Sequence, residues 1–287
     1  MAASVLFDQP GPATLRRHRL YTVVTVALVL VVGAWVVWKL NDAGQFESRI
    51  WNKLLAANVW REIRQGLTAT LIAAAVAIVT AIITGLLLAV GRLSDHRWVS
   101  RPCLVFIEFF RAVPLLLLML FLFSFIGAQF PELERNARAF LAVVVGLTLY
   151  NGSVLAEVFR AGIQAVPRGQ SEAAYAIGLR KTQVMTMILL PQAVRFMLPA
   201  IISQCVVVLK DTSLGFIVTY DELLRSAKTI ATYVGSSLMT YVVIAAIYIV
   251  LNSLLSALAT VVEGSLGRRG KATAAAVEQV EEAAGLQ

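Results

Sequence analysis

The sequence predicts an all-α polytopic membrane protein with six transmembrane helices. Of its 287 residues, 59% are hydrophobic and only 15% are charged, whereas a soluble domain is about half apolar and about a quarter charged. Uncharged intervals long enough to cross a bilayer, about 20 residues each, recur along the chain. These observations exclude a soluble enzyme, a nucleic-acid-binding module and a disordered scaffold.

The first predicted helix covers residues 20–40 and follows a cytoplasmic N-terminal segment, residues 1–19. Its uncharged core, from Leu20 to Trp38, spans 19 residues. A secretory signal has a shorter apolar core, of about 7–15 residues, followed by a small-residue cleavage site. Trp35 and Trp38 end this run instead, and tryptophan favours the membrane interface. The segment is therefore predicted to be a retained transmembrane helix.

An external loop, residues 41–64, leads to a transmembrane domain predicted for residues 65–265. That domain supplies the five other helices. Four of them correspond to the uncharged intervals 65–91, 112–131, 139–156 and 229–262, and the fifth, about 193–218, is interrupted by Lys210 and Asp211. Residues 266–287 form an Ala- and Glu-rich cytoplasmic tail.

The net charge of +8 is explained by topology. With both termini cytoplasmic, the inside segments hold fourteen Lys and Arg residues and the outside segments eight, as the positive-inside rule requires. Cys103 and Cys205 lie in apolar surroundings, and His18 and His96 lie in Arg-rich loops. None of the four fits a metal-binding or disulfide pattern, so we expect no metal site.

The cytoplasmic connection 160–192 is the most informative segment. Pro167 and Gly169 should end the incoming helix, Ser171 is a plausible N-cap for a new one, and Gly178 suits its C-terminal end. The new helix would be one to two turns long, with a face of small residues that another surface could approach. An ordinary connecting loop is the alternative.

The same segment resembles the EAA motif of permease subunits of bacterial ABC importers. The resemblance rests on Glu172-Ala173-Ala174, then Gly178, then Ile188 to Pro191. Further motifs outside this core resemble those of the subfamily that transports polar amino acids, of the glutamate, glutamine and histidine type. These motifs are Phe110-Arg111 through Pro114-Leu115, Ala156-Glu157 through Arg160, Gly162-Ile163, Gly169-Gln170, Pro199, and Lys210 through Leu214. The resemblance covers roughly residues 60–260.

The family resemblance implies that the short helix is a coupling helix that docks on a separate ATPase. Residues that would act in coupling are Gly169, Gln170, Glu172, Ala173, Ala174, Gly178 and Pro191. This chain has no GxxxxGK[ST] phosphate loop, so we expect it to bind no cofactor, with ATP and Mg on the partner. The implied partners are a cytoplasmic ATPase dimer, a second permease that is identical or related, and an external solute-binding protein.

Charged residues inside spans are functional candidates because their burial in lipid is costly. Glu108 and Arg111 are three apart on one helix and can pair, and Pro114 should bend that helix. Arg111 could bind a substrate carboxylate or simply neutralise Glu108. The family commonly has Gly-Thr where this chain has Ala112-Val113, and many members have a Tyr where it has Val154, so the resemblance implies a path that is lined differently here.

Four further residues are candidates for the substrate path. Lys210, Thr212 and Ser213 are predicted near the outer end of a helix, where they could serve either the substrate or neighbouring helices. Asn151 lies deep in its span, where its amide must find hydrogen-bond partners.

The sequence therefore predicts a permease subunit of an ATP-driven importer for a polar amino acid. Glutamate or aspartate is favoured because Arg111 and Lys210 suit an anionic substrate, but both would also suit the α-carboxylate of any amino acid, so glutamine and basic amino acids are alternatives. The chain itself is then not an enzyme, and it lies in the bacterial inner membrane as a multi-pass protein. An ion-coupled secondary transporter is the alternative. An intramembrane enzyme is a third possibility, against which stands the lack of an HExxH or GxSxG pattern.

Overall fold

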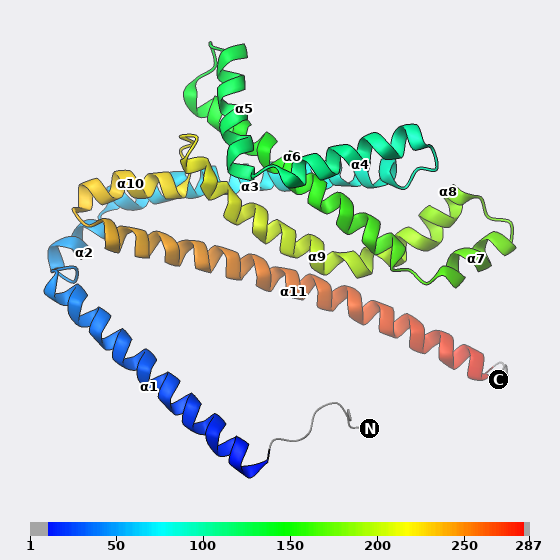
Figure 1. Ribbon diagram of the computed structural model, residues 1–287, viewed down its shortest axis with the longest axis horizontal. Coiled ribbons are helices and arrows are strands. Elements are labelled where there is room, and N and C mark those ends of the chain that lie inside the picture. Colours follow the sequence, from blue (N-terminus) through cyan, green and yellow to red (C-terminus); the bar gives the residue numbers. More distant parts are fainter. Residues whose placement is uncertain (1–10, 284–287) are drawn as a thin grey trace.

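A computed structural model describes residues 11–283 of the chain, apart from the side chains of 12, 13, 259 and 262–283. The described residues form helices joined by short connections, with no strand among them (Figure 1). The elements in order are α1 Pro12–Asp42, α2 Ser48–Leu54, α3 Ala57–Arg92, α4 Arg97–Ala112, α5 Leu115–Gln129, α6 Arg135–Gln164, α7 Arg168–Ala176, α8 Lys181–Gln183, η1 Val184–Leu189, α9 Leu190–Asp211, η2 Thr212–Phe216, α10 Leu223–Val234 and α11 Ser237–Ala283.

Five of the described helical stretches are long and apolar enough to cross a membrane, and α4 with α5 makes a sixth span if the bent pair is counted as one. The predicted all-α fold with six spans is confirmed in this sense. The stretches are Thr14–Asp42, Ala57–Arg92, Arg135–Gln164, Lys181–Phe216 and Ser237–Leu258. Apolar side chains face outward along all of them, because lipid is the solvent.

The centre of the molecule is the contact between α3 and α6. Small residues allow the two backbones to approach closely. A Cβ added at Gly85 would lie 2.8 Å from the Cβ of Leu155 and 2.9 Å from the carbonyl oxygen of Gly152. The hydroxyls of Thr80 and Thr148 form a hydrogen bond of 2.6 Å across the same contact. This pair of helices is the scaffold on which α4, α5 and α9 pack.

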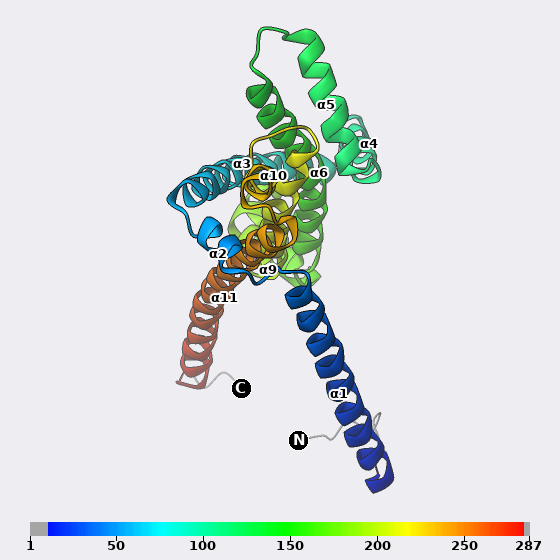
Figure 2. The ribbon, with the colours of Figure 1, turned by 90° about the vertical axis from the view of Figure 1, so that its left-hand side faces the viewer.

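The break between α4 and α5 turns the chain by 101°. Val113 adopts an extended conformation, φ −75 and ψ 127, immediately before Pro114, as a residue preceding proline prefers. The predicted bend at Pro114 is confirmed. The uncharged interval 112–131 is consequently not one straight helix: its first two residues close α4, and α5 turns away from α4 and packs against α6 (Figure 1 and Figure 2).

Helices α2 and α10, with the start of α11, close the end of the molecule that lies opposite α7 and α8. Its apolar core contains Ile50, Ile63, Leu223 and Ile230, all at most 4% exposed. The predicted external loop 41–64 is therefore structured, since it includes α2 and the first two turns of α3. Similarly, the interval 229–262 is divided by Gly235, which has φ +80 and ends α10.

Helix α1 stands apart from the other spans, and none of its apolar stretch is buried against the rest of the protein (Figure 2). It extends the predicted 20–40 helix in both directions, to Pro12 and Asp42. Residues 1–10 of the predicted N-terminal segment and 284–287 of the predicted tail lie outside the described residues. Within 266–283, the chain continues as part of α11.

Candidate functional site

The coupling segment predicted at 160–192 consists of the end of α6, the short helix α7, and the helical run from α8 into α9. Helix α6 ends at Gln164, three residues before Pro167, so the predicted break is confirmed. Helix α7 presents most of its surface to solvent at one end of the molecule (Figure 1). Only Ala174 is buried, at 4% exposed, because it packs toward the η1 turn.

One predicted feature of α7 is wrong. Ser171 is not the N-cap: the helix begins one turn earlier, at Arg168, with Pro167 in the capping position. Proline has a fixed φ and no N–H to satisfy, which suits the start of a helix. Ser171 instead donates its hydroxyl to the carbonyl oxygen of Arg168 at 2.8 Å. Glu172 therefore falls in the second turn, and the first turn carries no acidic residue.

The C-terminal end of α7 matches the prediction for Gly178. This glycine has φ +85, the left-handed region that only glycine adopts without strain. Its N–H donates to the carbonyl of Tyr175 at 2.9 Å, and the N–H of Leu179 donates to the carbonyl of Ala174 at 3.2 Å. This pair of hydrogen bonds is a Schellman motif, which ends α7 and leaves Ile177 77% exposed beside it.

The candidate Pro191 lies inside a nearly continuous helix that runs from Lys181 to Asp211. Proline lacks an N–H, and its ring collides with the carbonyl four residues earlier. The chain widens into a π-helical turn, η1, immediately before it, and this wider turn accommodates the ring. Gln192 then reaches back, and its amide lies 3.4 Å from the side-chain oxygen of Gln170 on α7. Gln170 and Pro191 thus belong to one local unit.

An ion pair joins this unit to the α3–α4 turn. Lys181 of α8 pairs with Asp95. The hydrogen bond from Lys181, together with its charge, lowers the pKa of the Asp95 carboxyl below its usual value. Both groups are exposed, so the pair contributes little to stability, but it places the α3–α4 turn and the coupling segment at the same end of the molecule.

The charged candidates on α4 are both exposed. Glu108 and Arg111 form no ion pair within 4 Å in the described part of the chain, so the local neutralisation considered from their spacing does not occur in this structure. Arg111 lies in the last turn of α4, directly before the break at Pro114. By contrast, Glu157 and Arg160 of α6 do pair, at 2.6 Å.

Asn151 is fully buried, with 0% exposed. Its Nδ2 donates to the carbonyl of Leu147 at 3.0 Å, and its Oδ1 accepts from the Gln204 side-chain amide at 2.5 Å. The partner that the sequence required for this amide is therefore Gln204 on α9. In this conformation Asn151 joins α6 to α9 and faces no open space.

The candidates at the C-terminal end of α9 and in η2 lie in two environments. Thr212 is buried and donates its hydroxyl to the carbonyl of Leu209 at 2.7 Å. Lys210 and Ser213 instead line a groove of about 920 Å³ between α9, α10 and α11, which we call the α9–α11 groove. Its other lining residues are Val206, Leu224, Tyr241, Ile244, Ala245, Tyr248, Ile249, Asn252, Ser253 and Ser256. Lys210 is the only charged side chain among them.

Several polar residues of this region were missed from the sequence. Glu222 is 0% exposed, caps α10 by accepting from the N–H groups of Leu224 and Arg225 at 2.7 Å, and accepts from the Tyr248 hydroxyl at 2.8 Å. Burial raises the pKa of Glu222 to about 7, although these hydrogen bonds favour its charged form. An acidic residue before an apolar run is a recognisable N-cap signal. Tyr248 and Asn252 were overlooked because the last span was defined by its lack of charge.

The sequence of this chain is similar to those of known transport proteins. Residues 81–268 match the family described as binding-protein-dependent transport system inner membrane component. The "Glutamate transport system permease protein GluD" of Corynebacterium glutamicum is 43% identical over 244 residues, which cover 85% of this chain and 89% of that protein. The "Glutamate/aspartate import permease protein GltK" of Escherichia coli O6:H1 is 31% identical over 191 residues, which cover 65% and 85%.

Two solved structures share the fold. A chain of a structure titled "Crystal structure of an amino acid ABC transporter with histidines" superposes with a TM-score of 0.66 at 30% identity, covering 71% of this chain and 94% of that one. A chain of the MetNI methionine ABC transporter superposes at 0.63 with 18% identity, covering 74% and 99%. The chain therefore belongs to the binding-protein-dependent transport system inner membrane component family, and within it to the permeases of amino-acid ABC importers.

Proposed function

We propose that this chain imports an acidic amino acid, glutamate or aspartate, using ATP hydrolysed by a separate ATPase that docks on α7. Two relatives are named for glutamate transport. An anionic substrate also fits the charges of the spans, because Arg111 and Lys210 are both exposed and neither forms an ion pair with a described acidic side chain.

The coupling role of α7 is supported by its shape and its attachments. Ala173 and Ala176 lie on its exposed surface, so an ATPase groove could approach the backbone closely, with Glu172 and Ile177 beside them. The Schellman motif at Gly178 fixes the end of α7, and the contact between Gln170 and Gln192 links the helix to α9. A force applied to α7 would then reach the transmembrane helices through α9, including its proline at position 191.

We further propose that both termini are cytoplasmic and that the protein lies in the bacterial inner membrane. The excess of Lys and Arg on that side supports this orientation. The expected complex contains an ATPase dimer carrying ATP and Mg, a second permease that is identical or related, and an external solute-binding protein. This chain would hold no cofactor of its own.

For the substrate path, we propose two points of contact with the carboxylates. One is Arg111, whose guanidinium can bind a carboxylate with two hydrogen bonds. The other is Lys210 with Ser213 in the α9–α11 groove, which offers hydroxyl and amide groups around a single cation. Glu108, Thr212 and Asn151 would shape the helices around this path: Thr212 and Asn151 are buried in the conformation described here.

The observation that carries the proposal is the exposed small-residue helix α7. Affinity purification of the tagged chain from its native membrane should recover an ATPase subunit with the wild type. The variant Ala173→Trp, which adds bulk to the exposed face of α7, should recover much less. Ala57→Trp makes the same change at an exposed alanine at the far end of the molecule and should recover as much as the wild type. Equal recovery with all three would contradict docking on α7.

Substrate choice is tested separately, with the purified complex in proteoliposomes. Labelled glutamate should enter only with ATP, and unlabelled aspartate should compete better than arginine. Lys210→Gln should raise the KM for glutamate, whereas Lys228→Gln, at the exposed outer surface, should not. If arginine competes as well as aspartate, the acidic preference is wrong while the importer assignment stands.

A further inference from the structure

Helix α4 has one packed face and one open face. Ile107, 1% exposed, points toward the helices behind it, and Cys103 lies so close to α3 that a Cβ added at Gly91 would be 2.5 Å from its sulfur. The opposite face forms a groove of about 810 Å³, which we call the α4 groove. It is lined by Arg97, Trp98, Arg101, Pro102, Val105, Phe106, Phe109 and Phe110.

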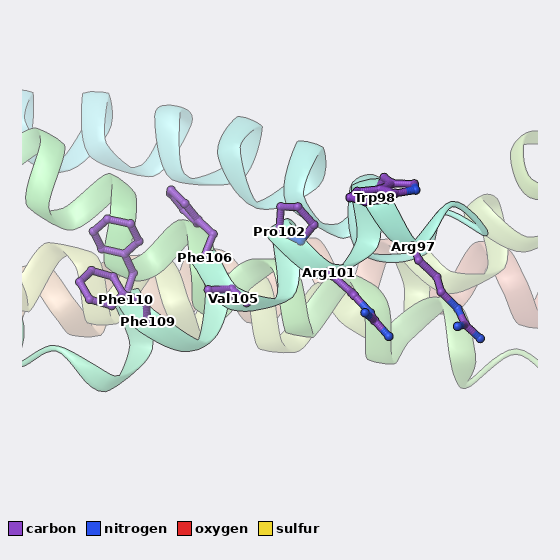
Figure 3. Close-up of a pocket in the computed structure, with 8 residues that line it drawn as sticks. All are labelled: Arg97, Trp98, Arg101, Pro102, Val105, Phe106, Phe109 and Phe110. Carbon is purple, nitrogen blue, oxygen red and sulfur yellow. The ribbon is translucent and has the colours of Figure 1, made fainter.

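The two ends of the α4 groove differ in chemistry. Figure 3 shows the guanidinium groups of Arg97 and Arg101 extending to the same side at one end, and the rings of Phe106, Phe109 and Phe110 at the other. Trp98 lies at the same end of the groove, with its ring on the other side of α4 from the two guanidinium groups in this view, and is 93% exposed. Tryptophan prefers the boundary between headgroups and hydrocarbon, so the charged end corresponds to the headgroup level.

The arginines have no acidic partner in the described part of the chain. The nearest acid in sequence, Asp95, is paired with Lys181 of α8. Arg92 and His96 add no negative charge to the same turn. The end of the groove therefore favours an anion from outside the chain.

The length of the groove fits one leaflet of a bilayer. Helix α4 packs alongside the membrane-spanning α3 (Figure 1). Nine residues separate Arg101 from Phe110, which corresponds to about 14 Å along a helix. Half of the hydrocarbon layer is about 15 Å thick. An acyl chain whose headgroup lies at the arginines would thus extend over the phenylalanines.

We propose that the α4 groove is a binding site for an anionic phospholipid, with its phosphate held by Arg97 and Arg101 and one acyl chain lying over Val105, Phe106 and Phe109. The site lies at the same end of the molecule as the coupling segment. Its assignment to the inner leaflet rests on the proposed function, whereas the binding itself does not.

Trp98 provides a reporter at the site. In a variant that keeps Trp98, the other four tryptophans are replaced by phenylalanine; they are Trp35, Trp38, Trp51 and Trp60. The purified chain is placed in vesicles containing equal mole fractions of phosphatidylglycerol or phosphatidylcholine, each brominated on its acyl chains. Phosphatidylglycerol should quench Trp98 more strongly, with a relative affinity of roughly five- to thirty-fold, because one or two basic residues act on the headgroup.

The variant Arg97→Gln with Arg101→Gln should lose this preference and retain quenching by phosphatidylcholine, which shows that the helix still faces lipid. The matched control, Arg16→Gln with Arg17→Gln, removes two exposed arginines from α1 and should keep the preference. Equal quenching of the reporter by both lipids would mean that the groove holds only non-selective boundary lipid. Shielding of Trp98 from both lipids would mean that a protein covers α4. Either result overturns the proposal without bearing on ATPase recovery, so the two proposals fail separately.

Discussion

Replacing Gly178 with alanine tests the coupling mechanism directly. The added Cβ would meet nothing within 4 Å, so no steric clash is introduced. The cost comes from the backbone, because φ is +85 and an L-residue in the left-handed region costs roughly 1–2 kcal/mol. The chain can avoid that cost only by giving up the Schellman hydrogen bonds that end α7.

The expected loss follows from this strain. If the ATPase requires the native end of α7, its affinity for the chain should fall by roughly 5- to 30-fold, since this is what 1–2 kcal/mol means for an equilibrium constant. The assay measures ATPase binding and the amount of amino acid transported per ATP in proteoliposomes. Gly178→Asn should be less harmful than Gly178→Ala, because asparagine tolerates the left-handed conformation better.

Gly235→Ala is the matched control. Gly235 ends α10 at the opposite end of the molecule, has φ +80, and a Cβ added there would also meet nothing within 4 Å. Alanine should cost the same roughly 1–2 kcal/mol of backbone strain there and leave ATPase binding unchanged. Wild-type coupling in Gly178→Ala, or an equal loss in Gly235→Ala, would refute the idea that the conformation at Gly178 positions α7.

Three other perturbations have definite expected outcomes. Gly85→Ala should destabilise the protein by roughly 1–3 kcal/mol, because the added Cβ meets backbone atoms of α6, and this should appear as a lower melting temperature in detergent. Gly33→Ala, whose Cβ would meet nothing within 4 Å, should leave the melting temperature unchanged. The free energy of unfolding should fall as pH rises from about 4.5 to about 7, because the Glu222 carboxyl holds its proton more tightly in the folded state than in the unfolded chain. The full effect is about 3 kcal/mol. Thermal melts over this pH range should show the fall for the wild type, and Glu222→Gln should lose this pH dependence. Asn151→Leu should leave the Gln204 amide without its partner and destabilise the α6–α9 contact by about 1–3 kcal/mol, seen as a lower melting temperature; an unchanged melt would show that Gln204 finds another acceptor.

Local features of the chain could be predicted where one residue type decides the backbone. Proline disfavours a helix interior, and the break expected at Pro114 is present, although Pro102 and Pro199 are accommodated inside α4 and α9. Glycine at 178 is the residue that a left-handed helix end prefers. The prediction for Ser171 is wrong because it treats Pro167 only as the end of the incoming helix. Proline also suits the start of the next helix, and α7 begins directly after it.

Tertiary partners were beyond sequence reasoning for a different reason. Asn151 could be recognised as needing a hydrogen-bond partner, but Gln204 lies on another helix, and its identity depends on how α6 and α9 cross. The angle of 101° between α4 and α5 likewise depends on packing against α6. Glu222 escaped notice because a charged residue in an expected external loop gives no sign that it is buried.

The run from Lys181 to Asp211 has a mechanical consequence. Because it is helical throughout, it behaves as a stiff rod about 45 Å long, joined to α7 at one end and carrying Lys210 at the other. The π-helical turn at Val184–Leu189 is its one wide turn, one residue longer per turn than the rest. Because a π-helical turn carries an extra residue, the side chains that follow it are rotated about the helix axis relative to an uninterrupted α-helix, so η1 decides which faces of α9 meet α6 and α11.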